Sequence, residues 1–359
     1  MAELLSIDQV RAETDKRLAA LFANYEPVAA QIDPVYKKLL SRMQEFIRRP
    51  GGKRLRPYLM YLSYIGSGGT DAATALDVAV SLELYHNLFL IHDDIIDRDL
   101  VRYNGPNIAG AYLADFTSRL SSPTEARHLA DSMALLAGDA TFGLALSTVI
   151  ESNFSSDIKV AAVRRINRMI IEEAGGELLD VMIPVLNEVD RSKERLLQVC
   201  RYKTASYSFS APLQLGAICA GQNSQAIPVW DDYAIPLGIA YQLADDILGM
   251  FGDEKILGKP GISDLREGKQ TIMIDYFLAQ ASEAQKATLM QYFGNPNVTL
   301  AQLKQVRQLL EVSGARKATV LLARSYAGAA KASLDKLDIL PSVRQELVIM
   351  ADLAVERQK

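Results

Sequence analysis

The chain has 359 residues and a formal net charge of −4, and 49% of its residues are apolar. This length accommodates one large core or two ordinary domains, and the composition excludes a disordered or fibrous protein. The slight acidity argues against a general attraction to nucleic acid or to an anionic membrane, so an anionic ligand would need a local basic site.

Apolar residues recur with a helical period along most of the chain, and no sustained alternation marks half-buried strands. We therefore predict an all-α fold of about ten helices, forming one domain over residues 1–359 without an internal linker. The helices at residues 71–97, 124–151 and 228–252 are apolar nearly all round, which is typical of helices surrounded by other helices. Residues 285–359 are more amphipathic and more charged, and we expect them to form an outer layer.

Local signals mark several helix ends. Thr70 or Asp71 can cap the helix at residues 71–97. Capping boxes are predicted at two further helix starts, where Ser122 precedes Glu125 and Thr299 precedes Gln302. Candidate helix stops are Gly66, Gly221 and Gly314.

The first cluster of cations is the segment PGGKRLRP at residues 50–57. Its glycines allow backbone N–H groups to approach an anion, and Arg side chains offer bidentate contacts to phosphate. The plain alternative is a solvated helix start. The cations here and further along the chain are Lys53, Arg54, Arg56, Arg102, Lys203, Lys259 and Lys269.

The helix at residues 71–97 ends in the acidic run HDDIID. Asp93 and Asp97 are four residues apart, so both project from one face, with Asp94 beside them and His86 higher on the same helix. Like charges at this spacing cost an isolated helix about 0.2–0.5 kcal/mol per pair, so they need compensation. Mg²⁺ is the natural candidate because it prefers carboxylate oxygens, whereas a solvated acidic helix end is the alternative.

A second acidic pair, Asp245 and Asp246, lies one turn after Gln242 in another strongly apolar helix. Burying uncompensated carboxylates costs roughly several kcal/mol. A cation cluster shared between two facing helices would compensate the carboxylates of both motifs. Acidic helix ends together with basic loops predict a phosphorylated substrate that is bridged through metal.

Other chemistries lack their motifs. The sequence has no P-loop, no dinucleotide fingerprint, no HExxH and no GxSxG. Cys200 and Cys219 lie in apolar surroundings, and the first residues carry no secretory signal, which predicts a cytoplasmic protein with free thiols. Residues 133–150 are apolar for the length of a membrane span, but Gly138 and Asp139 interrupt them, so we predict a buried helix and no integral membrane segment.

Six segments resemble the trans-isoprenyl diphosphate synthases, the family that includes farnesyl and geranylgeranyl diphosphate synthases. The resemblance runs from about Gly51 to Thr271. It implies one helical bundle of the isoprenoid synthase type around a central cavity, in a homodimer. The segments are GGKRLRP, HNLFLIHDDIID, LAGDATFG, YKTAS, YQLADDILG and GKPGISDLREGKQT.

The resemblance also implies a role for each matching residue in condensing isopentenyl diphosphate with an allylic diphosphate. Three Mg²⁺ ions would be held by Asp93, Asp94, Asp97, Asp245 and Asp246. The allylic diphosphate would be held by Arg102, Lys203 and Lys259, with Lys269 nearby, and isopentenyl diphosphate by Lys53, Arg56 and His86. Thr204 and Gln242 would place oxygens beside the allylic cation, and the released diphosphate would take the final proton.

Three positions depart from the pattern of the family. Tyr103 stands where the family has a second arginine, so it replaces one contact to isopentenyl diphosphate. Gly249 replaces the aspartate at the fifth position of the second acidic motif. Glu177 stands where the family often has glutamine.

Product length is predicted from the helix that precedes Asp93. Residues one turn apart would line the path of a growing tail, which places Phe89 first and Tyr85 next, with Leu88 beside them. A phenyl ring one turn below the metal would stop the tail early, so we predict farnesyl or geranylgeranyl diphosphate. The alternative is that Phe89 is ordinary core.

Two other functions share much of this pattern. A non-catalytic partner subunit would keep the fold, and the changes at Tyr103 and Gly249 favour it mildly, although the retained acids and lysines oppose it. A terpene cyclase would share the fold and one acidic motif, but it would not need a second diphosphate site at GGKRLRP. An assay with labelled isopentenyl diphosphate separates the three.

Overall fold

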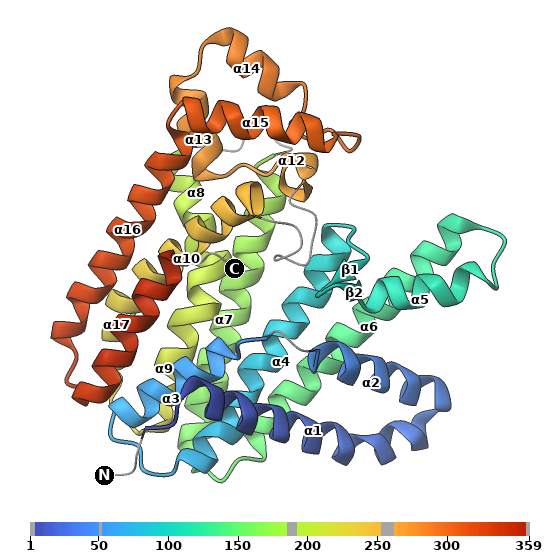
Figure 1. Cartoon of the computed structure of the whole chain (residues 1–359). Helices are drawn as coiled ribbons and strands as arrows, with labels where there is room; N and C mark the ends of the chain where they lie inside the picture. The colour runs from blue at the N-terminus through green and yellow to red at the C-terminus, as the bar shows by residue number, and fades with distance from the viewer. Residues whose placement is uncertain (1–3, 50–51, 185–191, 253–261, 357–359) are drawn as a thin grey trace. The chain divides into compact units, whose positions relative to one another are not determined.

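Helices account for nearly all regular structure in the computed structural model, which describes residues 4–49, 52–184, 192–252 and 262–356 (Figure 1). The all-α prediction is confirmed. The chain divides into two compact units, Met1–Ile65 with Gly69–Val163 and Gly66–Gly68 with Arg164–Lys359. The single domain expected over residues 1–359 stays a prediction.

The elements before residue 151 are six helices and a short hairpin. Their bounds are α1 Ile7–Ile32, α2 Pro34–Ile47, α3 Leu55–Gly66, α4 Ala72–Ile96, β1 Val101–Arg102, β2 Gly105–Pro106, α5 Ile108–Thr117 and α6 Pro123–Ile150. The division between the units falls within α7, Ser156–Met182. The later elements are α8 Lys193–Val199, the π-helix η1 Cys200–Ser210, α9 Ala211–Cys219, the 3₁₀ turn η2 Ile227–Trp230, α10 Asp231–Phe251, α12 Ser263–Glu267, α13 Ile272–Gln280, α14 Glu283–Met290, α15 Leu300–Val312, α16 Ala315–Ser333, the 3₁₀ turn η3 Leu334–Lys336 and α17 Pro341–Val355.

Helix α4 carries the first acidic motif and lies in the core of the first unit. Its N-cap is Asp71, which accepts a hydrogen bond from the Thr74 N–H at 3.1 Å, and its C-cap is Asp97, so the helix predicted over residues 71–97 is confirmed. The neighbours that pack along α4 include α6, α5 and α1. Because α4 is buried on most sides, it has no need of a polar face.

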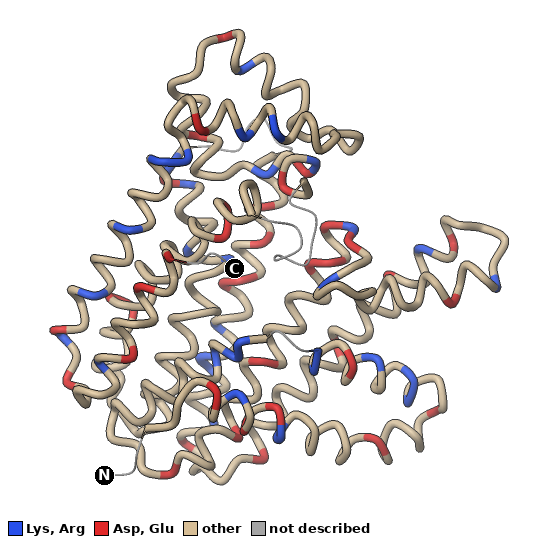
Figure 2. Tube along the Cα trace, viewed as in Figure 1, with Lys and Arg blue, Asp and Glu red and all other residues tan. Residues whose placement is uncertain are grey.

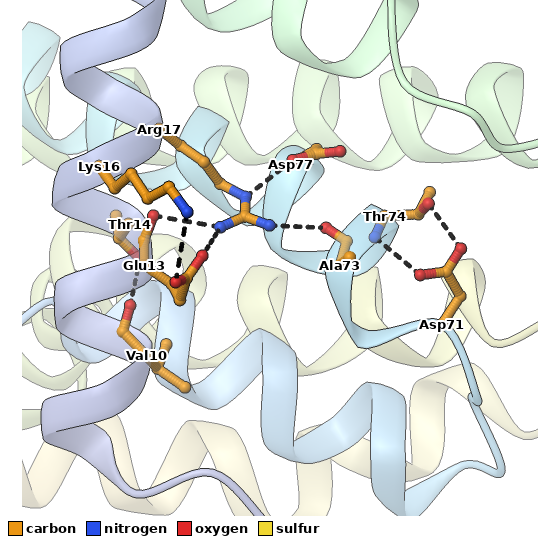
Figure 3. Close-up of polar contacts among 9 residues, drawn as sticks. All are labelled: Val10, Glu13, Thr14, Lys16, Arg17, Asp71, Ala73, Thr74 and Asp77. Carbon is orange, nitrogen blue, oxygen red and sulfur yellow. Dashed lines mark hydrogen bonds and ion pairs between the residues drawn. The ribbon is translucent and has the colours of Figure 1, made fainter.

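Helix α1 is tied to the start of α4 by a polar contact at the surface (Figure 3). Arg17 Nε donates to Asp77 Oδ1 at 2.7 Å, and Arg17 Nη2 donates to the Ala73 carbonyl at 3.4 Å. Glu13 accepts from the same guanidinium one turn earlier on α1. Partly exposed ion pairs of this kind contribute about 0.2–1 kcal/mol each, so the contact fixes register more than it stabilises the fold.

A hairpin follows α4, where the sequence showed no strand pattern. Val101 pairs with Pro106 and Arg102 with Gly105. The two turn residues, Tyr103 and Asn104, have φ of 54° and 58°. Positive φ at both positions is the geometry of the type I′ turn, which matches the twist of short antiparallel strands. The strands are too short to show alternation, which explains why they were not predicted.

Helix α10 carries the second acidic motif in the second unit, where η1, α16 and α17 pack around it. It begins at Asp231, later than the predicted start at residue 228, because Ile227–Trp230 forms a 3₁₀ turn. The helix ends at Phe251 as expected. The η1 segment is close enough to α10 that a Cβ on Gly238 would collide with Ala205.

Of the two predicted capping boxes, the one at Thr299 and Gln302 makes both reciprocal contacts. At Ser122 only one of the two contacts is seen, the hydrogen bond that Ser122 Oγ accepts from the Glu125 N–H at 3.3 Å. Gly221 and Gly314 adopt φ of 78° beyond the ends of α9 and α15. These are left-handed positions where glycine avoids the steric cost of a Cβ.

Two helices in the described part of the chain, α4 and α6, are long and apolar enough to cross a membrane by length and composition. In the most apolar window of α4, 78% of the residues are buried inside the protein, as in the core helix of a soluble fold, against 39% for α6. The prediction of a buried helix over residues 133–150 is therefore wrong for the chain as described, because Leu135, Leu136 and Ile150 are each at least half exposed. The absence of a membrane segment stays a prediction. Figure 2 shows acidic and basic residues interspersed along the chain, in keeping with the small net charge of −4.

Candidate active site

The first acidic motif is held by an arginine from the hairpin that follows it. Arg102 Nε donates to Asp94 Oδ1 at 2.7 Å, and Arg102 Nη2 reaches Asp94 Oδ1 at 2.6 Å and Asp93 Oδ2 at 3.3 Å. Asp93 lies in the last turn of α4, and Asp97 caps the helix. The structure therefore brings Asp93, Asp94 and Arg102 together, as an ion-paired cluster.

Asp94 is the buried member of this cluster. Its side chain is 3% exposed, and its Oδ2 has no hydrogen-bond partner among the described residues. Burial raises the pKa of Asp94 to about 6, although the Arg102 charge opposes the shift. A buried carboxylate oxygen without a partner is costly, so this site favours an added cation.

Within the described residues, no three His, Cys, Asp or Glu side chains converge as a ready metal cage. This does not conflict with magnesium, which is commonly held by one or two carboxylates while water and substrate phosphate complete its shell. The donor set of the first motif, carboxylate oxygens with one unpaired, fits a hard divalent ion.

The basic segment at residues 52–57 contains three cations, of which Arg54 has a structural role. Arg54, which is 6% exposed and has φ of 50°, pairs with Glu83 and with Asp15 and donates to the Ile47 carbonyl. Its charge is paired within the protein, where it holds the loop to α4. Lys53 is exposed and Arg56 is half-buried at the start of α3, so these two are better placed for a ligand.

His86 and Tyr103 lie in the same unit as these cations. Burial, together with the charges of Arg56, Arg102 and Arg54, lowers the pKa of His86 well below its usual value, so the imidazole is neutral at pH 7. Tyr103 sits in the hairpin turn with its ring 6.4 Å from that of Phe46, and burial raises its pKa. A neutral phenol can donate a hydrogen bond but adds no charge.

In the second unit, the predicted residues surround a cavity of about 20 Å³, large enough for about one water. Thr204 Oγ1 donates to Gln242 Oε1, and Gln242 Nε2 donates to Asp246 Oδ1 at 2.8 Å. Burial raises the pKa of Asp246 to about 7. Lys203 and Lys269 also line the cavity. Five predicted residues therefore lie at the cavity or directly beside it.

Two carboxylates from α7 hold the lysines of this cavity. Lys203 Nζ lies 2.6 Å from Asp180 Oδ2 and 2.8 Å from Glu177 Oε2, and Lys269 Nζ lies 3.9 Å from Asp180. Burial opposes the charge of Asp180, but the two lysines outweigh it and lower its pKa. Asp180 also raises the pKa of Lys269, which stays charged.

Asp180 was missed by the sequence reasoning, and Glu177 was noted there without a physical role. Their spacing of three residues on an expected helix was the available signal, because it places both acids on one face. The structure gives the reason for their position: a Cβ on Gly176 would collide with the backbone of Tyr202 and Lys203. Gly176 thus lets η1 approach α7 closely enough for Lys203 to reach both acids.

The π-helical form of η1 agrees with a functional segment, because such helices are rare and are frequently found at functional sites. It runs from Cys200 to Ser210 and carries both Lys203 and Thr204. Gly176 permits its close approach to α7 and Gly238 its approach to α10.

The glycine at position 249, where an aspartate was expected, lies against a carboxylate. A Cβ on Gly249 would collide with Asp264 Oδ2, so a longer side chain there would require the Asp264 side chain to move. Asp264 was not among the predicted residues. Asp245 is half-buried beside Asp246 on α10, and Lys259 lies outside the described residues.

The residues predicted to limit product length lie on α4. Tyr85 is 1% exposed and Leu88 6% exposed, whereas Phe89 is half-buried. The Tyr85 ring meets the Phe142 ring of α6 edge to face at 5.8 Å, and the Tyr85 hydroxyl has no hydrogen-bond partner among the described residues. Phe142 was missed because no local pattern pairs α4 with α6.

The fold places the chain among the all-helical prenyl synthases. It matches the structure of geranylgeranyl pyrophosphate synthase from Corynebacterium glutamicum, complexed with isoprenyl diphosphate and magnesium, with a TM-score of 0.92 and 29% identity over 99% of this chain and 100% of that one. The sequence pattern of the polyprenyl synthetase family matches residues 37–310. The chain belongs to the polyprenyl synthetase family.

Relatives with similar sequences support the same family. The chain is 31% identical to the short chain isoprenyl diphosphate synthase of Methanothermobacter thermautotrophicus over 93% of this chain and 95% of that protein. It is also 31% identical to the geranylfarnesyl diphosphate synthase of Aeropyrum pernix over 87% of this chain and 92% of that protein. The resemblance recognised from the six segments is confirmed.

Proposed function

We propose that this protein is a short-chain trans-prenyltransferase that condenses isopentenyl diphosphate with an allylic diphosphate and releases diphosphate. The observation that carries the proposal is the cavity of the second unit, where Lys203, Thr204, Gln242, Asp246 and Lys269 meet in a chain of this family. Farnesyl and geranylgeranyl diphosphate are the proposed products.

The described residues are suited to the departure of an allylic diphosphate. Ionisation of such a substrate leaves negative charge on the diphosphate, and fixed cations stabilise that charge in a site with little water. Lys203 and Lys269 would supply those cations, together with Arg102 and Lys259. The hydrogen-bonded oxygens of Thr204 and Gln242 would face the allylic cation and stabilise its positive charge.

A divalent metal is part of this proposal, with magnesium as the ion. The residues that would hold it are Asp93, Asp94, Asp97, Asp245 and Asp246, in a cluster of three ions. When bound, the metal neutralises the diphosphate and favours its departure as a leaving group. The unpaired Asp94 oxygen and the raised pKa values of Asp94 and Asp246 support a cation at both motifs.

Isopentenyl diphosphate would bind at the cations of the first unit. Lys53 and Arg56 would contact its phosphates, and His86 and Tyr103 would donate hydrogen bonds. Because its pKa is lowered, His86 would act as a neutral donor and would add no charge. With Arg54 already paired, the site would depend on two cations and two neutral groups.

We also propose a homodimer in the cytoplasm. Helix α6 exposes Leu135, Leu136 and Ile150, each at least half exposed, and α7 exposes Ile171 and Leu178 at 73% and 61%. Apolar side chains in such numbers on long helices suit an interface between copies of one chain. Cys200 and Cys219 are both free and buried, which suits a reducing compartment.

The decisive experiment is an assay of the purified protein with labelled isopentenyl diphosphate, Mg²⁺ and each of dimethylallyl, geranyl and farnesyl diphosphate. We expect label in a prenyl diphosphate of farnesyl or geranylgeranyl length, and no incorporation when EDTA replaces Mg²⁺. Failure of all three primers to accept label would refute the catalytic assignment. Main products of six or more units would refute only the assigned length.

A further inference from the structure

A cavity of about 340 Å³ lies in the second unit and shares no lining residue with the cavity at Lys203. It is bordered by α7, η1, α9, η2 and α10. The two cavities use different residues of η1: Lys203 lines one, whereas Arg201 and Tyr202 line the other. The proposed reaction gives the larger cavity no role.

The lining of this cavity carries more positive than negative charge. Three guanidinium groups, from Arg165, Arg168 and Arg201, face two carboxylates, from Glu172 and Asp231. The acids are already engaged within the protein: Glu172 Oε1 accepts from Arg168 Nε at 2.7 Å, and its Oε2 accepts from a serine hydroxyl. Asp231 Oδ1 accepts from a second serine at 2.5 Å. The cavity therefore has one net positive charge to offer.

Arg165 is the buried cation of this group. Its side chain is 9% exposed, its Nε donates to Gln214 and its Nη2 donates to Ser210 Oγ at 2.9 Å. Its Nη1 has no hydrogen-bond partner among the described residues and lies 3.8 Å from Glu172 Oε2. A buried donor without an acceptor is costly, and a bound acceptor would recover that cost.

The other two arginines are exposed in the single chain, where Arg168 lies one turn before Ile171 of the proposed dimer interface. The side chain of Arg168 is 76% exposed, and Arg201 is an exposed residue whose guanidinium lies 5.6 Å from the centre of the Tyr202 ring. Arginine binds carboxylate and phosphate oxygens in bidentate fashion. We propose that this cavity is a second binding site, separate from the candidate active site, for a small molecule that carries a phosphate or carboxylate group.

The position of the only tryptophan supplies a direct readout. Trp230 is 3% exposed, and it lies in the chain between Pro228 and Asp231, which both line the cavity. The full-length protein is titrated with inorganic phosphate and, separately, with malonate, at constant ionic strength in EDTA, while Trp230 fluorescence is recorded. Potassium chloride serves as the control for salt.

Variants assign the response to the cavity. We expect a saturable change in fluorescence for wild type and at least tenfold weaker binding in the double variant Arg168→Ala/Arg201→Ala, whose exposed positions should tolerate the change. The matched control is Arg164→Ala, because Arg164 is exposed on α7 beside Arg165 but does not line the cavity. That variant should bind as wild type does.

The two anions distinguish a ligand that binds through a phosphate group from one that binds through a carboxylate group. Binding of phosphate alone, or of malonate alone, with loss in the double variant, would identify the class of ligand. The proposal is overturned if neither anion gives a saturable change. It is equally overturned if wild type and the double variant bind with the same affinity, since the anion would then sit elsewhere.

Discussion

The two units of the chain hold their charged groups in opposite ways. In the first unit, one arginine on a two-strand hairpin pairs with two carboxylates at the end of α4, Asp93 and Asp94, and leaves a net negative charge. In the second unit, two carboxylates neutralise two lysines, Lys203 and Lys269, of which Lys203 lies on a helix pressed against its partners.

The difference lies in how firmly each cluster is held. Arg102 directly precedes the two-residue turn of the hairpin, and its partner Asp94 still has an oxygen without a hydrogen bond. Asp180 and Glu177, by contrast, lie on the long helix α7, where the glycine at 176 fixes the approach of η1. We therefore infer that in the first cluster Arg102 can give up its contacts with the carboxylates to a metal ion. In the second cluster Lys203 and Lys269 stay in place.

The largest expected effect is on turnover. Replacing Asp93 or Asp245 with alanine should lower kcat by orders of magnitude while far-UV circular dichroism stays unchanged, because both carboxylates would act on charge that develops in the reaction. Asp338→Ala, a change at an exposed acid in the described part of the chain, is the control and should be neutral. Full activity in Asp93→Ala would remove the metal assignment.

The second cluster is tested by stability. Asp180→Asn leaves Lys203 and Lys269 with less compensation in a buried place, so the free energy of unfolding in urea should fall by about 3 kcal/mol. The matched control is Asp352→Asn, which removes the partner of Lys331 in a pair that is 37% and 47% exposed. That change should cost about 1 kcal/mol or less. Equal losses would show that burial does not distinguish the two pairs.

The path of the prenyl tail is a further test of the first unit. Phe89→Ala should lengthen the main product by at least one isoprene unit, because it removes a ring one turn below Asp93. Tyr85→Ala should add to that effect only once Phe89 has been removed. Product chromatography measures both, and Phe142→Ala tests whether the ring that meets Tyr85 shares the role. An unchanged product in Phe89→Ala would leave that ring as ordinary core.

If Arg102 competes with a metal ion for the carboxylates, removing Arg102 should change the affinity of the protein for Mg²⁺. Arg102→Ala removes the ion pairs that Arg102 makes with Asp93 and Asp94, so Mg²⁺ should bind the protein several-fold more tightly in the absence of substrate, as followed by calorimetry. Arg49→Ala, which removes a hydrogen bond to the Arg102 carbonyl and leaves the guanidinium in place, is the control. Weaker metal binding in Arg102→Ala would contradict the idea of an exchangeable cation.

The smallest effect is expected at the hairpin turn. Tyr103→Arg restores the cation that the family has and should tighten the KM for isopentenyl diphosphate or leave it unchanged. The backbone cost is the same for both residues, because each must adopt the positive φ of 54°. A protein inactivated by this change would give Tyr103 a role beyond a hydrogen bond.

Much of the fold followed from local signals. The start of α4 at Asp71, the cap at Ser122 and the box at Thr299 depend on hydrogen bonds between residues three apart, which a sequence displays directly. The acidic and basic motifs were legible for the same reason, since side chains three or four residues apart share a helix face.

The contacts that the sequence could not supply join distant residues. Asp180 reaches Lys203, Glu83 holds Arg54, Phe142 meets Tyr85 and Asp264 fills the space beside Gly249. No periodicity relates such residues, because their meeting depends on which helices pack and at what depth. The sequence by itself determined the all-helical fold class, several helix ends and the family, and hence the reaction. Only the tertiary structure decided which charges are spent within the protein and which remain for a ligand, because burial and pairing are properties of packed helices.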